Sequence, residues 1–226
     1  PAAEGFLDEF FNSLQKQTEK HFDVIIINDG IKNLQSYKSR YNELNIIEKK
    51  VYSLPAKNRE IGIKAVINLG YEYIIFGDSD DYFSENRIEK TIMALNANHL
   101  VINELTLFSK YSEQKDFLKN NLKNMDSPQE NILNGNVFGF SNIGIRSEVI
   151  NPQFNLTSDL IIIDWFFVAS ILLKKDCQIQ FLNDVYTYYR QHSSNTIGMS
   201  KVLTKNKLEF SLLVKQKHYD ELLKFC

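Results

Sequence analysis

The spacing of apolar residues changes repeatedly along the first half of the chain, and each spacing predicts a different element. Phe6, Phe10 and Leu14 recur at helical intervals, which predicts an amphipathic helix. The unbroken apolar runs 24–27 and 73–76 are instead typical of strands that are buried on both faces. The chain is therefore expected to begin with a helix and to continue with alternating strands and helices.

Helical spacing returns between the two strands and after them. It predicts helices over 31–41, 61–69 and 88–95, the last with Ser84 as its cap, and there is a weak strand pattern over 51–54. This alternation predicts an α/β fold with a mixed, mostly parallel central sheet that is flanked by helices. In open sheets of this kind, ligands bind beyond the carboxyl ends of the strands.

The second half of the chain has a less regular pattern, and no shift in composition marks a linker. We therefore predict a single domain over residues 1–226. The expected strands are 99–108, as one long strand or a pair, then 137–145, 179–182 and 185–189, and the expected helices are 116–125, one that opens at Asp164, and 203–225.

Composition places the chain among ordinary globular proteins, because 43% of its residues are hydrophobic and 24% are charged. A net charge of −2 provides no basic field, so we expect no nucleic-acid partner. Cys177 and Cys226 form no metal-type or redox-type pair in the sequence, which indicates a reduced setting. No apolar run reaches the roughly 20 residues that span a bilayer, and the start of the chain does not have the pattern of a signal peptide.

The stretch DSDD places Asp78, Asp80 and Asp81 directly after the second predicted strand. Carboxylates at this density repel one another unless a cation lies among them, and hard oxygen ligands suit Mg²⁺ or Mn²⁺. The alternative is a solvated turn whose aspartates cap the next helix. A second acidic turn, at 28–30, ends the first strand, and both turns fall where ligands bind in such sheets, which favours a site.

Asp164 lies between two apolar runs, 160–163 and 165–168, and it opens a helical pattern. Partial desolvation there would raise the pKa of its carboxyl and make it a better general base. From the residues alone a helix cap is the favoured interpretation, and the two roles do not exclude each other. Trp165, the only tryptophan, fits either a core position or a face on which a sugar ring stacks.

Several motifs, in this order, resemble those of family 2 glycosyltransferases with a GT-A fold. The first half contains SLQKQT, NDG, NREIG and DSDD, where the family has SLxxQT, DDGS, ARNxG and DxDD. The second half contains IDW and YYRQHSSN, which are similar to the family's EDW helix start and its YRxHxxN segment. The resemblance extends from Phe6 to Gly198. It implies a nucleotide-sugar-binding half over about 1–98, an acceptor and catalytic-base half over about 99–198, and a C-terminal helix over 199–226.

The resemblance implies that a sugar moves from a nucleoside-diphosphate-sugar, with UDP as the favoured nucleotide, to an acceptor hydroxyl with inversion at the anomeric carbon. Asp164 matches the family's catalytic base. Asp80 and Asp78 match the carboxylates that contact Mn²⁺ or Mg²⁺, and Asp78 is also a candidate for contact with the donor. His192 matches a late histidine near the diphosphate, where it would be a further metal ligand.

The resemblance also implies which residues hold the donor nucleotide. Asn28 and Asp29 match the turn that contacts the nucleobase or the ribose. Arg59 matches an arginine at a helix start, which would reach phosphate or anchor the acidic turn. Arg190 belongs to the segment that shapes the diphosphate site, and residues 191–198 are expected to close over the donor as a lid.

The chain also departs from the family pattern. Asn28 stands where a carboxylate is usual, and Glu60 replaces the usual asparagine after Arg59. The family's first strand, which normally lies centrally in the sheet, is missing, so either the sequence is incomplete or another segment takes its place. These departures keep open a non-catalytic nucleotide-sugar-binding or scaffold module. A Mg²⁺-dependent phosphotransferase with an aspartate nucleophile is a further alternative.

By resemblance, the acceptor is a saccharide or a lipid-linked saccharide, and the pathway is bacterial surface polysaccharide synthesis. The least patterned segments, 110–137 and 151–159, are expected to line the acceptor site. The lysine-rich C-terminal helix is expected to pack on the core of the protein. A membrane surface and a second copy of the chain are the other candidates for what it contacts. We expect a cytoplasmic protein, with the inner face of the membrane as a second location.

Overall fold

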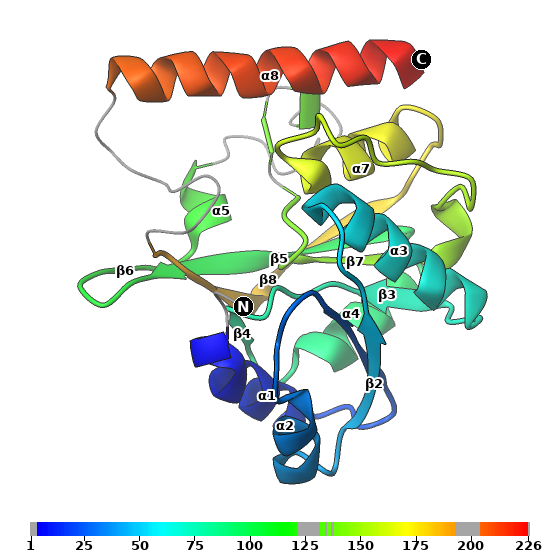
Figure 1. Cartoon of the computed structure of the whole chain (residues 1–226), viewed down its shortest axis with the longest axis vertical. Helices are drawn as coiled ribbons and strands as arrows, with labels where there is room; N and C mark the ends of the chain where they lie inside the picture. The colour runs from blue at the N-terminus through cyan, green and yellow to red at the C-terminus, as the bar shows by residue number, and fades with distance from the viewer. Residues whose placement is uncertain (1–3, 122–131, 134, 137, 193–203, 226) are drawn as a thin grey trace.

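The computed structural model describes residues 4–121, 132–133, 135–136, 138–192 and 204–225. Within these residues the chain forms two separate sheets and the helices around them (Figure 1). The α/β class predicted from the alternation of elements is confirmed.

The smaller sheet has two parallel strands, β1 (Asp23–Asn28) and β2 (Asn45–Lys50), which are joined through helix α2 (Leu34–Arg40). The strand predicted at 51–54 was wrong, because the pairing partners of β1 lie in 45–50 instead. Only Val24 and Asn28 of β1 are buried, so the prediction of burial on both faces also failed. Among the described strands β1 pairs with β2 alone, so one of its edges has no strand beside it.

The larger sheet has the order β3-β7-β5-β8-β4, with β6 paired to β5. The pair β5–β8 is parallel, and the pairs that involve β7, β4 or β6 are antiparallel, so this sheet is mixed and less parallel than predicted. The strands are β3 (Tyr73–Ile75), β4 (Tyr82–Phe83), β5 (Leu100–Phe108), β6 (Glu113–Gln114), β7 (Ile143–Arg146) and β8 (Ile179–Arg190).

Strand β8 combines two segments that the sequence predicted as separate strands. Its pairing with β5 shifts between Asn103 and Glu104, where the partner changes from Leu182 to Tyr186. The extra residues of β8 are accommodated as an irregularity in one continuous strand. Strand β7 begins at Ile143, so it is shorter than the predicted strand 137–145.

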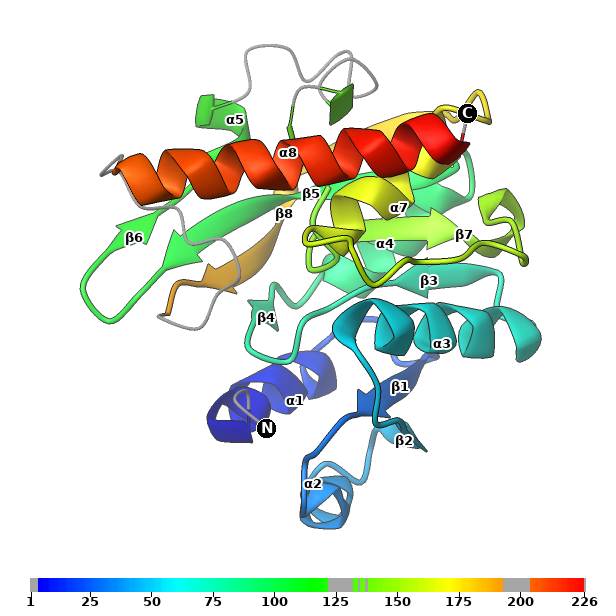
Figure 2. The same ribbon diagram turned by 45° about the horizontal axis from the view of Figure 1, so that its top comes forward.

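The helices cover the larger sheet on both faces. Helix α4 packs on one face, and α3 and α7 lie on the other beneath the long helix α8 (Figure 2). The 3-10 turns are Glu4–Phe6 and Ser147–Val149, and the helices are α1 (Leu7–Gln15), α3 (Pro55–Asn68), α4 (Arg87–Leu95), α5 (Phe117–Asn121), α7 (Ile163–Leu172) and α8 (Lys205–Phe225).

Ser84 does not cap α4 as predicted. The helix begins at Arg87, and the Ser84 hydroxyl oxygen accepts a hydrogen bond from the Tyr186 backbone N–H at 3.0 Å. The Ser84 backbone N–H in turn donates to the Tyr186 carbonyl at 2.9 Å. Ser84 therefore fastens the end of β4 to β8.

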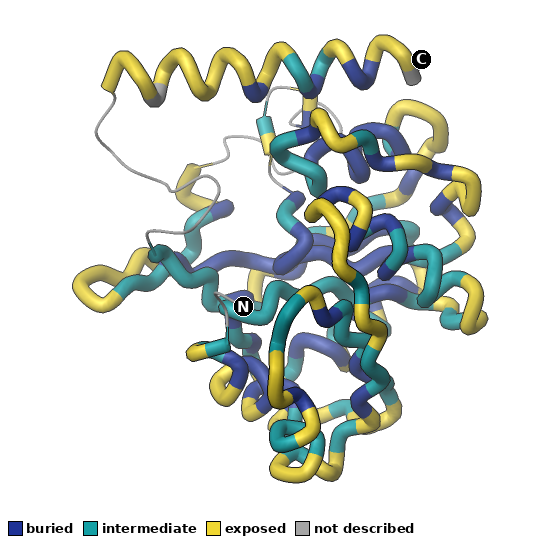
Figure 3. Tube along the Cα trace, viewed as in Figure 1, coloured by how far each residue is buried: buried dark blue, intermediate teal, exposed yellow. Residues whose placement is uncertain are grey.

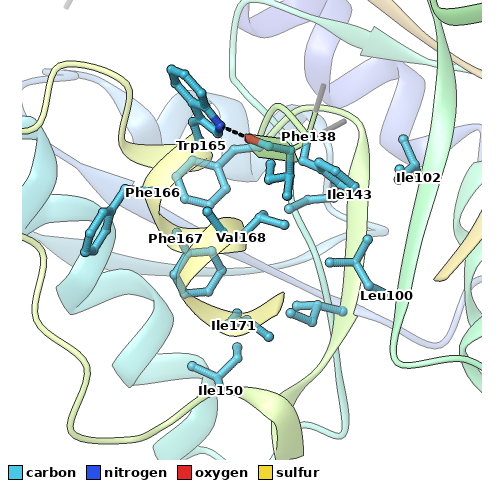
Figure 4. Packing of buried hydrophobic residues seen from close by; sticks show 14 of the residues in the cluster. Leu100, Ile102, Phe138, Ile143, Ile150, Trp165, Phe166, Phe167, Val168 and Ile171 are labelled. Atoms are coloured by element: carbon cyan, nitrogen blue, oxygen red, sulfur yellow. Dashed lines mark hydrogen bonds between the residues drawn. The ribbon is translucent and has the colours of Figure 1, made fainter. Parts of the chain in front are cut away.

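The main core surrounds α7, in which every residue from Trp165 to Ile171 is buried (Figure 3). The Trp165 side chain is 2% exposed, and its indole N–H donates to the Ile132 carbonyl (Figure 4). Its ring also stacks on His218 of α8, with ring centroids 3.6 Å apart. Trp165 is thus a core residue and has no face on which a sugar could stack. The packing of α7 fixes its first turn, which carries Asp164.

Candidate active site

The acidic turn follows β3 and has one buried and two partly exposed carboxylates. The side chains of Asp78 and Asp80 are each 27% exposed, whereas Asp81 is 1% exposed. The Asp81 backbone N–H donates to the Asp78 carbonyl, which closes the turn. The Asp81 carboxylate accepts a hydrogen bond from the Arg190 backbone N–H at 2.8 Å, and burial raises its pKa well above the ordinary value. Asp81 therefore anchors the turn to β8, and Asp78 and Asp80 remain available to a ligand.

Arg59 lies among the carboxylates of the site. It projects from the first part of α3 and forms an ion pair with Asp78, and its guanidinium lies 5.2 Å from the centroid of the Phe140 ring. The negative charge of Asp78 is the main cause of its raised pKa, with contributions from Asp164 and Asp80. Arg59 thus links the acidic turn to the turn that carries Asp164.

Asp80 and His192 lie side by side, as a shared role in metal binding requires. His192 Nε2 is 2.8 Å from Asp80 Oδ2, and the two side chains are 22% and 27% exposed. The Arg190 Nε–H donates to the Asp80 carbonyl at 2.8 Å, which fixes the backbone of this pair. In the part of the chain that the structure describes, no three His, Cys, Asp or Glu side chains form a metal centre. An ion held here would take its remaining ligands from water and from substrate phosphate, as Mg²⁺ and Mn²⁺ commonly do.

Asp164 lies in the first turn of α7, one residue after the helix begins at Ile163. Its Oδ1 accepts a hydrogen bond from the Trp165 N–H at 2.9 Å. Ile162 occupies the cap position, so the prediction of an Asp164 cap was wrong. Burial raises the pKa of Asp164 to about 6; the negative charge of Asp78 adds to this, whereas hydrogen bonds from Asn136 and Trp165 oppose it. A carboxyl with this pKa accepts a proton effectively near neutral pH.

Asn28 points into the protein at the end of β1. It is 4% exposed, and its side-chain oxygen accepts hydrogen bonds from the N–H groups of Gly30 and Ile31 at 2.9 and 2.7 Å. Its side-chain nitrogen donates to Glu48 at 2.7 Å. Asn28 therefore shapes the turn, and Gly30 has a positive φ of 148° there. Asp29 is exposed at the tip of this turn. Contact of either residue with a nucleotide stays a prediction.

Arg190 is held by several groups around the acidic turn. Besides its bonds to Asp80 and Asp81, it forms an ion pair with Glu9 of α1. Its guanidinium lies 4.3 Å from the centroid of the Phe6 ring and 4.5 Å from that of Phe108. The start of α1 is therefore part of the site's border. Most of the predicted lid, 193–198, lies outside the described residues, as does 122–131 of the predicted acceptor segment.

Three residues beside the site were missed at the sequence level. Gly139 lies next to Asp164, since a Cβ at this position would be 3.6 Å from Asp164 Oδ2 and 3.2 Å from Asn142 Oδ1. The Ser141 hydroxyl accepts a hydrogen bond from the Asp78 N–H at 3.3 Å. Arg87 is 2% exposed beneath the turn, and it donates to the carbonyls of Phe76 and Ser141 at 2.7 and 3.0 Å.

Of these three residues, only Arg87 could have been found from the helical pattern of the sequence. Arg87 shares the buried face of α4 with Ile88, Thr91 and Leu95, which is an unusual place for a charge. Burial lowers the pKa of Arg87 to about 9, although the charges of Asp81 and Asp78 oppose this effect. Gly139 and Ser141 lie in an irregular segment, where periodicity carries no information.

Solved structures of glycosyltransferases resemble this chain over most of its length. TarS of S. aureus, solved in complex with UDP-GlcNAc, is 18% identical with a TM-score of 0.69, and the match covers 95% of this chain and 63% of that one. A mannosyltransferase from Pyrobaculum calidifontis, solved with GDP-Man and Mn²⁺, is 9% identical with a TM-score of 0.62 and covers 97% and 61%. These likenesses confirm the GT-A fold.

Curated relatives are longer than this chain. An uncharacterized glycosyltransferase of Rickettsia felis is 33% identical over 134 residues, which are 58% of this chain and 20% of that protein. An uncharacterized glycosyltransferase of Haemophilus influenzae is 32% identical over 109 residues, 44% of this chain and 41% of that protein. None of the described helices is both long and apolar enough to cross a bilayer. The family model for glycosyl transferase family 2 matches residues 2–150, and the chain therefore belongs to this family.

Proposed function

We propose that the chain is a metal-dependent, inverting hexosyltransferase that moves a sugar from a UDP-sugar to a hydroxyl of a saccharide or lipid-linked saccharide. The observation that carries the proposal is that Asp164, whose pKa is about 6, and Asp80, which is paired with His192, both lie close enough to Arg59 for their charges to raise its pKa. One group can accept a proton from the acceptor while the other holds the leaving diphosphate.

The reaction is a single displacement in which atoms and charge balance. The acceptor oxygen forms a bond to the anomeric carbon as its proton moves to the Asp164 carboxylate. The bond from that carbon to the diphosphate oxygen breaks, and the nucleoside diphosphate leaves with the electron pair. Attack from the face opposite the leaving group inverts the anomeric carbon. Arg59 stabilises negative charge beside Asp78 without changing its own protonation.

Asp80 and His192 would hold Mn²⁺ or Mg²⁺. A carboxylate oxygen and an imidazole nitrogen 2.8 Å apart fit a site in which the protein supplies few ligands and the diphosphate supplies others. The ion would neutralise charge on the leaving diphosphate. Asp78, which is already paired with Arg59, fits a supporting place next to this pair.

The test measures UDP release from UDP-GlcNAc, UDP-glucose and UDP-galactose with Mn²⁺, comparing Asp164→Asn with the parent chain. UDP-GlcNAc comes first because TarS was solved with it. Loss of the base should lower kcat by about 10²- to 10⁴-fold. UDP release by the parent should rise through about pH 6, because Asp164 must be ionised to accept a proton.

Asp176→Asn is the matched control, since Asp176 is an exposed aspartate that follows the same helix and lies outside the segments expected to line the acceptor site. Unchanged turnover in Asp164→Asn would refute the assignment of the base. Tight binding of UDP and Mn²⁺ without any turnover by the parent would favour a non-catalytic module instead. We also propose that the protein acts in surface polysaccharide synthesis, in the cytoplasm or at the inner face of the membrane. Its relatives in Rickettsia felis and Haemophilus influenzae are bacterial proteins.

A further inference from the structure

A cleft of about 660 Å³ lies where α1 meets the edge strand β4 and the end of β8. The ribbon shows α1 beside β4 at this place (Figure 2). The cleft begins next to the acidic turn, because Tyr82 directly follows Asp81, and Arg190 lines the cleft while it bonds to the Asp80 carbonyl. Its volume falls within the range of about 300–1,000 Å³ that is usual for small-molecule sites.

A stack of aromatic rings forms part of the cleft's lining. Tyr82 and Tyr188 are direct partners across β4 and β8, and their rings are almost parallel, at 10°, with centroids 4.4 Å apart. Phe108 meets Tyr82 edge to face, with centroids 5.1 Å apart. All three side chains are partly exposed. The strand pairing fixes these rings in place, so a ligand can bind beside them without ordering them first.

Helix α1 supplies the polar part of the lining. It presents the exposed side chains of Glu9, Asn12 and Lys16 to the cleft, and Glu9 is paired with Arg190. A sugar ring has one face of C–H groups and a rim of hydroxyls, so it matches a lining that combines aromatic rings with amides and charges. An alkyl chain would leave the groups of α1 without hydrogen-bond partners.

The cleft lies beyond the reacting centre. Asp164 and Asp78 are near Arg59, and none of these three residues lines the cleft, which Arg190 borders. A sugar in the cleft is therefore outside the immediate surroundings of Asp164. We propose that the cleft is a saccharide subsite that binds a unit of the acceptor chain other than the unit that reacts. This inference rests on the proposed function.

The test is ¹⁹F NMR of the whole chain labelled with 3-fluorotyrosine, titrated with chitotetraose, cellotetraose and maltotetraose. The chain has 11 tyrosines, and single Tyr→Phe variants assign the signals of Tyr82, Tyr188 and Tyr73. Tyr73 is the control, because it is a partly buried sheet tyrosine outside the cleft. We expect saturable shifts of the Tyr82 and Tyr188 signals by at least one tetrasaccharide, with no shift of Tyr73.

Asn12→Ala should weaken this binding about tenfold, and Tyr188→Ala should do so at least as strongly. The proposal is overturned if no tetrasaccharide shifts the Tyr82 and Tyr188 signals, or if both variants bind as tightly as the parent. Binding of UDP with Mn²⁺ is measured on the same sample. If the parent chain binds UDP but no saccharide, the subsite is refuted and the proposed function is not. If the parent chain does not bind UDP, the result counts against the proposed function.

Discussion

Asp164→Asn should stabilise the folded chain while it removes the proposed base. Folding raises the pKa of this carboxyl from its ordinary value of 3.8 to about 6, mainly by burial, so the folded state disfavours the ionised form. Below about pH 4 the carboxyl is protonated in both states and there is no penalty. As the pH rises to 6 the unfolded chain loses its proton first, and the penalty grows to about 3 kcal/mol and then stays constant.

Asparagine has no charge to desolvate and can still accept the hydrogen bond from the Trp165 N–H. The variant should therefore exceed the parent in free energy of unfolding by about 2–3 kcal/mol at pH 7, and the difference should shrink towards zero near pH 4. Urea unfolding followed by circular dichroism at both pH values measures this gap. A variant less stable than the parent at pH 7, or a gap that does not change with pH, would refute the reasoning. Asp176→Asn, at an exposed aspartate, should show no gap.

The remaining predictions concern other parts of the fold and the site. Glu60→Gln should lower the free energy of unfolding by about 3 kcal/mol at pH 7, because Lys57, Lys64 and the Leu156 N–H outweigh burial and lower the pKa of Glu60 to about 2. In urea unfolding, this loss of stability should fade as the pH drops towards 2. A loss that is equal at every pH would contradict the prediction. Gly144→Ala should lower the free energy of unfolding by about 1–3 kcal/mol in thermal unfolding, because its Cβ would lie 2.4 Å from Thr91 Cγ2. Gly5→Ala, with open space around it, should lower the free energy of unfolding much less. Equal losses in the two variants would be evidence against overpacking at Gly144. His192→Ala should raise the Mn²⁺ concentration for half-maximal UDP release by about tenfold, and His21→Ala, at a side chain that is 98% exposed, should leave it unchanged; the same value in both variants would remove His192 from the metal site.

The sequence supported those parts of the fold where the hydrophobic pattern was strong. Helix α1 and strands β1, β3 and β5 lie where unbroken or periodic apolar runs predicted them. Strand β2 was missed because only Ile46 and Ile47 are apolar, and the rest of 45–50 is polar on a small sheet. The continuity of β8 depends on its irregular pairing with β5, which no local pattern contains.

For the site, the order of the motifs predicted which residues lie close together, but it did not predict where each side chain points. The structure brings Arg59, Asp78, Asp80 and His192 together, as their order in the motifs led us to expect. The inward orientation of Asn28 depends on hydrogen bonds to backbone groups of its own turn and to Glu48, a residue of the neighbouring strand. Such long-range partners are set by the fold, so the residue type alone could not distinguish a ligand contact from a turn former.

The burial of α7 has a consequence for the chemical bond that the chain would make. Asp164 stands on a helix whose next seven residues, 165–171, are all buried, so the backbone that carries its carboxylate is held in place. With Asp164 as the base, only the hydroxyl that the acceptor presents at that fixed point loses its proton. The regiochemistry of the new linkage is then decided by how the rest of the acceptor is seated, and changes around the acceptor, away from Asp164, are those that would alter it.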